Sequence, residues 1–326
     1  MLPHLTDPDL IPVCRAASIE RLRTVSPVCG YCRSVRPHAR GAGDPEQEIQ
    51  VKVAAVQMVS GPDVQTNLRQ AAALIAQAAE CGAELVALPE YFCLMGHRDR
   101  DKLAAAESTT PVANGPIQAA LSGWARQHGI WLIGGTLPLR IEGDAGRVHN
   151  SCLVFDPQGR LAARYDKIHL FRFDDGERRY DEAATLQAGT AGPVAFDCID
   201  RAGTHLRVGL SVCYDLRFPE LYRALMHPPC DLLVVPAAFT HPTGAAHWEL
   251  LLRARAVENQ CHILAPAQGG LHENGRRTWG QSMVVGPWGQ VLAQQAQGEG
   301  VVLATVDLAR QRELRQRLPA LEHRRL

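Results

Sequence analysis

The chain has 326 residues, of which 46% are hydrophobic and 21% charged, a composition typical of globular proteins with a large core. Basic and acidic residues both number 34, so the basic excess of general nucleic-acid binders is missing. The sequence has neither a run of 18 apolar residues nor a compact apolar segment near its start, which argues against a membrane-spanning helix and a secretory signal. Ten scattered cysteines do not resemble a disulfide framework and predict the reducing cytoplasm.

Residues 1–50 differ in character from the rest of the chain. They contain several Pro, Arg and Gly residues without a sustained apolar period, so we expect a loosely ordered extension before one domain at 51–326. Cys29 and Cys32 form a CxxC pair, with another cysteine and a histidine nearby. A structural zinc site requires four well-spaced ligands. We therefore favour an extension without a chemical role, and a regulatory zinc site stays open as the alternative.

From residue 51 onward, apolar periodicity predicts strands that alternate with helices. Pro116 and Gly129 mark the two ends of one helix, and Gly82 follows another. The expected helices cover 64–81, 116–128, 219–227 and 245–260, and the expected strands cover 51–58, 84–88, 130–136, 206–212, 231–236, 262–266, 282–285 and 300–306. A hairpin at 150–165 interrupts the alternation. This pattern predicts a layered α/β fold with mixed sheets.

Two charged side chains come at the ends of apolar strands. Glu90 follows LVALP and precedes two aromatic residues, and a carboxylate partly removed from water is a good general base near neutral pH. Lys167 stands within YDKIHLF, where an ammonium can stabilise a developing oxyanion. The alternatives are a solvated loop glutamate and a strand-end lysine whose ammonium reaches water.

Cys213 ends a third apolar strand in RVGLSVCYDLRFPE, where the chain turns before a helix. This placement is typical of a nucleophile elbow, in which backbone N–H groups such as that of Tyr214 can face a substrate oxygen. The alternative is a cysteine that fills space in the core. Arg217 is four positions beyond Cys213 rather than six, which argues against a phosphatase loop, and no histidine lies in a papain-type signature.

The segments AAVQM, LPEYF, YDKIHLF, CYDLRFPE and AHWELLLRARAVENQ occur in this order within residues 51–310. Together they resemble the nitrilase superfamily of carbon–nitrogen hydrolases, which use a Glu-Lys-Cys triad in that chain order. The resemblance implies that Glu90 is the general base, that Lys167 stabilises the tetrahedral intermediate and that Cys213 is the nucleophile. It also implies that Glu182, in YDEAATLQAG, is a second glutamate close to the triad.

The resemblance further implies a four-layer αββα sandwich and a homodimer or larger homo-oligomer. Separately, we expect the Arg-rich stretch 307–326, which ends in EHRRL, to form a helix that reaches a partner subunit. Tyr214 and Asp215 follow the nucleophile, whereas enzymes that act on nitriles typically have Trp-Glu, so the Nit-type amidases are the more similar branch. The implied reaction is hydrolysis of a linear amide through a cysteine thioester, without a metal or organic cofactor. We expect a keto-acid amide such as deaminated glutathione as the substrate. The alternative substrates are α-ketoglutaramate and the substrates of a carbamoylase, a nitrilase or an aliphatic amidase. The alternative to an enzyme is a catalytically silent binding scaffold.

Several residues are candidates for binding the substrate. Arg217 is the cation nearest to Cys213 in sequence, with Arg172 and Arg178 as further candidates for a substrate carboxylate. Arg217 could instead be a structural partner of Asp215 or Glu220, and this alternative stays open. We expect Thr243 to line the pocket mouth. His247 is interpreted as a packing residue at the start of helix 245–260 rather than as a catalytic acid.

Overall fold

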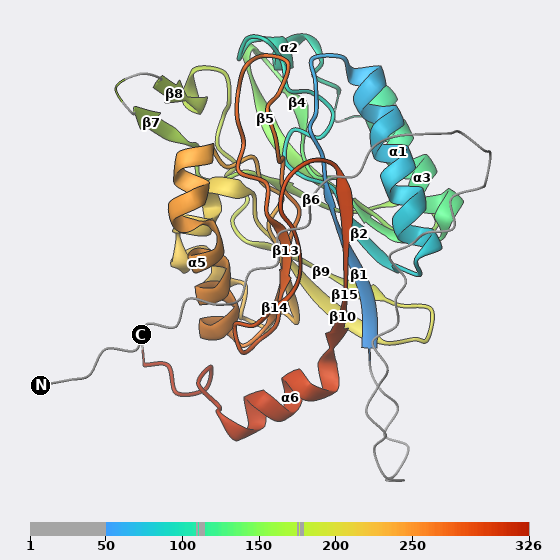
Figure 1. Cartoon of the computed structure of the whole chain (residues 1–326), viewed down its shortest axis with the longest axis vertical. Coiled ribbons are helices and arrows are strands. Elements are labelled where there is room, and N and C mark those ends of the chain that lie inside the picture. Colours follow the sequence, from blue (N-terminus) through green and yellow to red (C-terminus); the bar gives the residue numbers. More distant parts are fainter. Residues whose placement is uncertain (1–49, 109, 111–114, 175, 177–178, 326) are drawn as a thin grey trace, which may run out of the picture. The chain divides into compact units, whose positions relative to one another are not determined.

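The computed structural model describes residues 50–108, 110, 115–174, 176 and 179–325 (Figure 1). The chain divides into two units between Glu46 and Gln47, and all described residues belong to the second unit. The predicted extension and its Cys29 and Cys32 therefore lie outside the described residues. Within the described part, no helix has the length and apolar character needed to cross a membrane.

The first of two large sheets has seven strands, in the order β15-β1-β2-β3-β5-β4, with β6 paired to β5. Its strands are β1 (Gln50–Gln57), β2 (Leu85–Ala87), β3 (Trp131–Ile133), β4 (Leu137–Ile141), β5 (Asp144–Phe155), β6 (Leu161–Asp166) and β15 (Gly300–Asp307). Strands β1, β2 and β3 are parallel, whereas β15 runs antiparallel to β1. The sheet is therefore mixed, as the sequence predicted.

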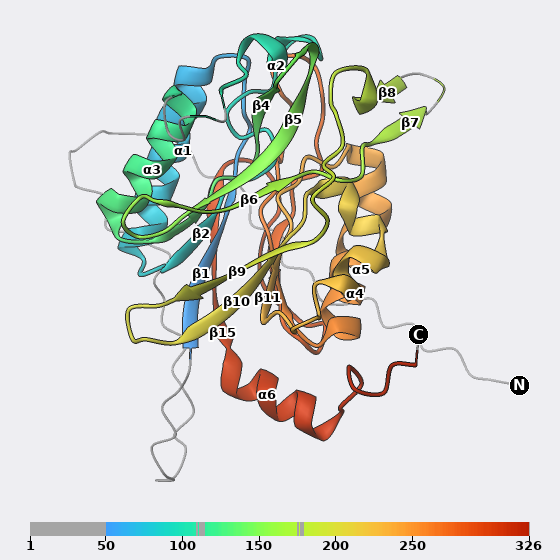
Figure 2. The same ribbon diagram turned by 180° about the vertical axis from the view of Figure 1, so that it is seen from behind.

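The second sheet has six strands, in the order β14-β13-β12-β11-β10-β9, and its central strands β10, β11 and β12 are parallel. The strands are β9 (Val194–Ile199), β10 (His205–Leu210), β11 (Leu232–Val234), β12 (His262–Ala265), β13 (Ser282–Val285) and β14 (Val291–Gln295). A small hairpin of β7 (Arg172–Asp174) and β8 (Arg179–Asp181) lies apart from both sheets (Figure 2).

Helices cover the outer face of each sheet, so the described unit has four layers (Figures 1 and 2). Alternate residues of β1 show this arrangement, because neighbouring side chains on a strand point to opposite faces. Val53 and Ala55 belong to the core shared with the second sheet, whereas Ala54 and Val56 pack in the core with the helices. Helices α1 (Val64–Glu80) and α3 (Pro116–His128) cover the first sheet, and α4 (Pro219–Ala224) and α5 (His241–Asn259) cover the second. The predicted αββα sandwich is confirmed.

Local signals explain where the helices begin and end. The Asp63 side chain caps α1 by accepting a 2.7 Å hydrogen bond from the N–H of Thr66. Pro116 opens α3, and Gly129, with a φ of 60°, closes it in the left-handed conformation that favours glycine. Fully buried Leu121 anchors α3 to the sheet, which contributes about 2 kcal/mol from apolar burial alone.

Helix α5 begins at His241, four residues before the predicted start at 245. Pro242 lies in its first turn, where the fixed φ and missing N–H of proline are compatible with a helix. His247 is therefore an exposed residue of the second turn, and its predicted place at the start of the helix is wrong.

The remaining helical segments are α2 (Asp101–Ala104), α6 (Leu308–Arg317) and two 3-10 turns at Glu182–Ala184 and Cys213–Arg217. The helix expected within 307–326 is thus present as α6.

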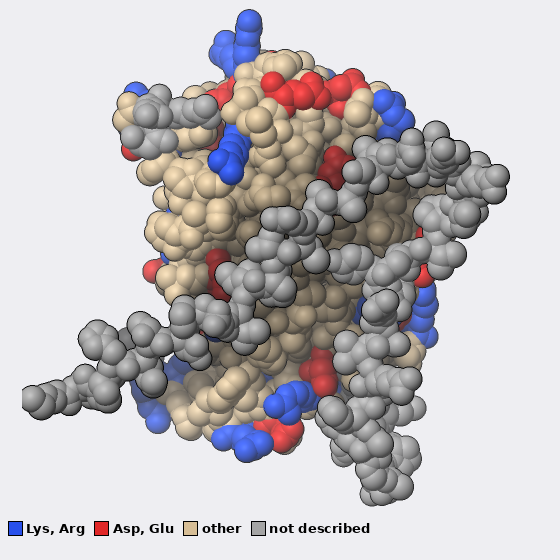
Figure 3. All heavy atoms as spheres, in the orientation of Figure 1, with Lys and Arg blue, Asp and Glu red and all other residues tan. Residues whose placement is uncertain are grey.

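On the face shown in Figure 3, acidic and basic side chains of the described residues are intermixed rather than segregated, in keeping with the zero net charge.

Candidate active site

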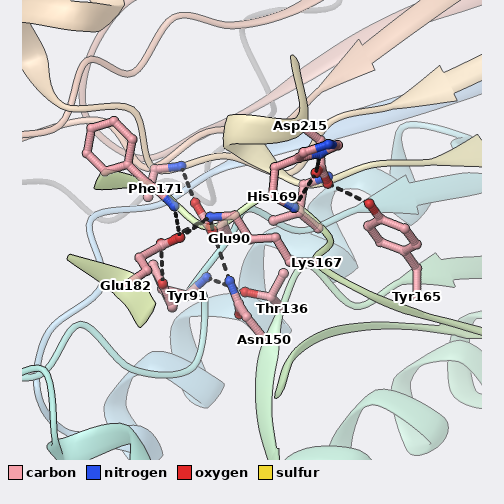
Figure 4. Close-up of polar contacts among 12 residues, drawn as sticks. Glu90, Tyr91, Thr136, Asn150, Tyr165, Lys167, His169, Phe171, Glu182 and Asp215 are labelled. Atoms are coloured by element: carbon pink, nitrogen blue, oxygen red, sulfur yellow. Dashed lines mark hydrogen bonds and ion pairs between the residues drawn. The ribbon is translucent and has the colours of Figure 1, made fainter. Parts of the chain in front are cut away.

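The three side chains predicted at strand ends meet in one place. Glu90 follows β2 of the first sheet, Lys167 follows β6 directly, and Cys213 follows β10 of the second sheet. Glu90 and Cys213 line a common cavity with Glu182, and Lys167 is in contact with both carboxylates (Figure 4). The carboxyl ends of strands from two different sheets therefore build the site.

Lys167 is held between the two carboxylates and is fully buried, with 0% of its side chain exposed. Its Nζ is 2.9 Å from Oε1 of Glu90, and 3.0 and 2.8 Å from Oε1 and Oε2 of Glu182. Burial alone lowers the pKa of Lys167, but the charges of Glu182 and Glu90 outweigh it and hold the pKa well above its usual value. Lys167 is a permanent cation at neutral pH, and the alternative of a lysine that reaches water is wrong.

Glu90 is buried, and donors fix both of its oxygens. Asn150 Nδ2 and Lys167 Nζ each donate to Oε1 at 2.9 Å, and the N–H of Ala238 donates to Oε2 at 3.0 Å. The next residue, Tyr91, has a φ of 56°, and its N–H donates to Thr136 Oγ1 at 2.9 Å. The alternative of a solvated loop glutamate is therefore wrong, and the carboxylate has one fixed orientation.

Glu182 accepts four hydrogen bonds, which come from Lys167, Tyr91 and Phe171. Besides the two from Lys167, the Tyr91 hydroxyl donates to Oε1 at 2.9 Å and the N–H of Phe171 donates to Oε2 at 2.7 Å (Figure 4). Burial raises the pKa of Glu182, but the charge and hydrogen bonds of Lys167 more than offset it, so the pKa is below its usual value. Glu182 is thus an ionised carboxylate that, like Glu90, holds the Lys167 ammonium.

Cys213 sits at a sharp bend. Its φ is 49°, a conformation that costs energy for a side chain with a Cβ, and its N–H donates to the carbonyl of Pro236 at 2.9 Å. Burial and then the charge of Glu90 raise the pKa of the Cys213 thiol well above its usual value, although Lys167 and the N–H of Ala238 act in the opposite direction. The thiol is therefore protonated at rest, and a base is needed to convert it into a thiolate.

Asp215 secures this bend from inside the protein. Its Oδ2 accepts hydrogen bonds from the N–H of Val212 at 2.8 Å and from the Tyr165 hydroxyl at 2.7 Å. Its Oδ1 accepts a bond from the N–H of His169 at 3.1 Å and lies 2.7 Å from Nδ1 of the same histidine (Figure 4). Asp215 is fully buried and pairs with His169. The alternative that Arg217 serves as its structural partner is wrong.

The cavity beside Cys213 contains about 300 Å³ of empty space. Its walls include the three residues predicted to bind substrate, namely Tyr214, Arg217 and Thr243. The Arg217 guanidinium lies 5.8 Å from the ring centre of Tyr214 and 5.6 Å from that of Phe239. Arg217 also contacts Nδ1 of His247 at 3.3 Å, so its neighbour there is an imidazole ring rather than a carboxylate.

Three further arginines were compared with the cavity wall, two of them predicted from the sequence and one not. Arg172 is exposed on β7 and is not part of the cavity wall, whereas Arg178 lies outside the described residues. Arg276, on the loop between β12 and β13, lines the cavity although no motif pointed to it. Across the described part of the chain, no group of three or more His, Cys, Asp and Glu side chains is arranged to hold a metal ion.

Comparisons with known proteins agree with this geometry. The profile of the carbon–nitrogen hydrolase family matches residues 52–316. A deaminated glutathione amidase of Synechocystis sp. is 41% identical over 273 residues, which cover 83% of this chain and 97% of that protein. Omega-amidase NIT2-A of Xenopus laevis is 38% identical over 275 residues, or 84% of this chain and 95% of that protein.

Among solved structures, the NitFhit protein of C. elegans has a TM-score of 0.75 and 38% identity, over 85% of this chain and 65% of that chain. This chain thus spans less than two thirds of the length of NitFhit. The resemblance to the nitrilase superfamily is confirmed. The chain belongs to the carbon–nitrogen hydrolase family and is an amide-hydrolysing enzyme of the Nit type.

Proposed function

We propose that this enzyme hydrolyses a linear keto-acid amide through a thioester on Cys213, with Glu90 as general base and Lys167 as the cation for the oxyanion. The observation that carries the proposal is the buried ammonium of Lys167, held between Glu90 and Glu182 in the cavity that also contains the thiol. A structural ion pair would not require a protonated thiol on a strained backbone bend beside it.

In the first step Glu90 takes the proton of the Cys213 thiol as the sulfur attacks the amide carbon. The raised pKa of Cys213 makes this transfer necessary, because little thiolate exists beforehand. Negative charge then develops on the carbonyl oxygen. The Lys167 ammonium and the N–H of Tyr214, the second residue of the 3-10 turn that begins at Cys213, stabilise that oxyanion.

In the second step Glu90, now protonated, donates its proton to the leaving nitrogen, and the C–N bond breaks to give the free amine and the thioester. Glu90 next removes a proton from water, whose oxygen attacks the thioester and releases the acid and the thiol. Glu182 takes no proton in this scheme. It fixes Lys167, and the steps require only side chains of this chain and water.

For the substrate, we propose an amide whose acyl end carries a keto-acid carboxylate. Arg217 supports this choice, because its guanidinium lines the cavity with no carboxylate of the described residues in contact with it. Thr243 lies in the first turn of α5 and lines the same wall. The names of the relatives give deaminated glutathione as the first candidate and the omega-amidase substrate α-ketoglutaramate as the second.

The test is an assay of amine and keto-acid release from a small panel, with Cys213→Ala as the control. The panel contains deaminated glutathione, α-ketoglutaramate, glutamine, N-carbamoyl amino acids and a nitrile. Release of 2-oxoglutarate from deaminated glutathione by the native enzyme alone supports the proposal. Turnover only of α-ketoglutaramate or only of carbamoyl compounds contradicts the first substrate, and normal turnover by Cys213→Ala contradicts the mechanism.

We also propose that the enzyme is cytoplasmic and forms a homodimer or larger homo-oligomer. Several large apolar side chains on α5 and the β13–β14 turn support this assembly, since Leu250 is 68%, Val257 51% and Trp288 66% exposed. Light scattering of the purified protein measures its mass. A monomer at micromolar concentration would contradict the proposal.

A further inference from the structure

A second hollow adjoins the catalytic cavity and has no part in the mechanism above. It contains about 1100 Å³ of empty space, some of it open to solvent, and lies between the segment after β2 and the loop that joins β12 to β13. Arg276 lines both hollows. The two segments are tied together, because Asn274 Nδ2 donates to the carbonyl of Gly96 at 2.6 Å.

The lining of this hollow is predominantly basic. Arg98, Lys102, Arg179 and Arg276 contribute cations, and Asp99 contributes one carboxylate. No carboxylate among the described residues forms an ion pair with Lys102 or Arg276. The Nε of Arg276 is buried without a hydrogen-bond partner in the described structure. Cations that are partly removed from water and form no ion pair within the described residues are suited to bind an anion from outside.

Lys102 connects the hollow to the catalytic groups through Tyr91. Its Nζ lies 5.4 Å from the ring centre of Tyr91, whose hydroxyl donates to Glu182. Burial lowers the pKa of Lys102, and the charge of Glu182 partly opposes that effect, so the ammonium is close enough to interact with the catalytic carboxylate. An anion bound by Lys102 would therefore lie just beyond the Glu182 side of the site.

The contacts of Arg276 indicate that this hollow lies on the leaving-group side of the scissile bond. Its Nη2 donates to the carbonyl of Ala238 at 3.3 Å, and the N–H of the same residue holds Glu90 Oε2. Glu90 is the proton donor to the leaving nitrogen in the proposed mechanism. The leaving amine thus departs next to Arg276, whereas Arg217 is assigned to the acyl carboxylate.

We propose that the hollow binds the terminal carboxylate of the leaving amine, with Lys102 and Arg276 as its cations. This inference rests on the proposed function and makes it more specific. The substrate then carries an anionic group at each end, as in a keto-acid amide of a dipeptide. A primary amide, which releases ammonia, gains nothing from the hollow. The site consequently favours deaminated glutathione over α-ketoglutaramate.

The decisive variant is Lys102→Met, which removes the ammonium and retains the length of the side chain. The chain has three lysines, and Lys52 provides the matched control, because its Nζ donates to the carbonyl of Cys81 at 3.2 Å and it lines neither hollow. Each variant is assayed on deaminated glutathione and on α-ketoglutaramate. We expect Lys102→Met to lower the ratio of the two kcat/KM values about tenfold or more, and Lys52→Met to leave it unchanged. An equal effect of Lys102→Met on both amides, or no effect, overturns the inference.

A change in the substrate tests the same contact without altering the protein. Deaminated glutathione with its terminal carboxylate replaced by a carboxamide should lose about tenfold in kcat/KM with the native enzyme and almost nothing further with Lys102→Met. Full activity of the native enzyme on the carboxamide overturns the inference.

A binding measurement separates failure of this inference from failure of the proposed function. Calorimetry with Cys213→Ala and the dipeptide cysteinylglycine requires no turnover. Millimolar binding that Lys102→Met weakens and Lys52→Met retains supports the hollow even if the enzyme acts on another amide. Absence of saturable binding, or binding that is indifferent to Lys102→Met, overturns the inference even if deaminated glutathione is hydrolysed.

Discussion

Replacement of Glu182 by glutamine tests whether the second carboxylate positions Lys167, the proposed cation for the oxyanion. The carboxylate accepts bonds only from donors, namely Lys167 Nζ, the Tyr91 hydroxyl and the N–H of Phe171. A glutamine side chain has one acceptor oxygen and one NH₂ group. In either amide orientation, the NH₂ group therefore faces donors, and Lys167 loses one of its two counter-charges.

The expected size of the effect follows from these contacts. Loss of a hydrogen bond to a charged group costs about 1.5–3 kcal/mol, and a buried donor without an acceptor adds about 1–3 kcal/mol. Because part of this cost also weakens the fold, we expect about 3 kcal/mol in transition-state stabilisation, or roughly a hundredfold lower kcat/KM. The assay is the initial rate on whichever amide the native enzyme hydrolyses.

Tyr91→Phe is the matched control for Glu182→Gln. It removes one donor to Glu182 but retains the charge next to Lys167, so it should cost about 1 kcal/mol, or less than tenfold in kcat/KM. Circular dichroism and a melting curve establish that both variants are folded. A folded Glu182→Gln enzyme with kcat/KM close to the native value would refute the positioning role of Glu182.

Three further predictions concern the pocket, the bend and pH. Arg217→Ala should raise KM or abolish turnover for keto-acid amides, and unchanged kcat and KM would remove Arg217 from the site. Asp215→Asn places an NH₂ group against the donors of Val212, Tyr165 and His169, so urea titration should show unfolding free energy lower by about 2–4 kcal/mol; a change below about 0.5 kcal/mol would contradict this. The folded pKa of Glu182 is below its usual 4.5, so its stabilisation is present above about pH 4.5 and is lost as pH falls through the folded pKa. The difference in unfolding free energy between the native enzyme and Glu182→Gln should therefore shrink as the pH falls below about 4.5. A difference that widens in acid would contradict the reasoning.

The sequence predicted those elements whose ends carry a strong chemical signal. Helix α3 has its predicted bounds because Pro116 and Gly129 determine its ends. Strand β14 was not predicted, since its five residues are exposed or half-buried and lack an alternating apolar pattern. Strands β4 and β9 were not predicted either. Each lies at the edge of a sheet and is hydrogen-bonded to one neighbouring strand, and this pairing is not visible in the sequence. The edge strand β15 was predicted, because its residues GVVLATV form a longer apolar run.

The same distinction applies to the site. Glu90, Lys167 and Cys213 were recognisable because reactive side chains at strand ends are unusual. Ala238 was not recognisable, since it acts through a backbone N–H that nearly every residue possesses, and it contacts Glu90 across 148 positions of sequence. Asn150 gave a weak signal as an amide at the start of the apolar run NSCLVF, and only the fold shows that it reaches Glu90.

The proposed catalytic groups come from two different sheets, and this origin has a mechanical consequence. Glu90 extends from the first sheet, and Cys213 and Ala238 extend from the second, so the distance between base and nucleophile is set by how closely the sheets pack. Side chains between the sheets, such as Ala55 and Val208, act as spacers for the reaction although they are remote from the substrate. Under the proposed mechanism the turnover rate should therefore depend on the spacing of the two sheets, and an enlarged core side chain should lower kcat before it unfolds the protein.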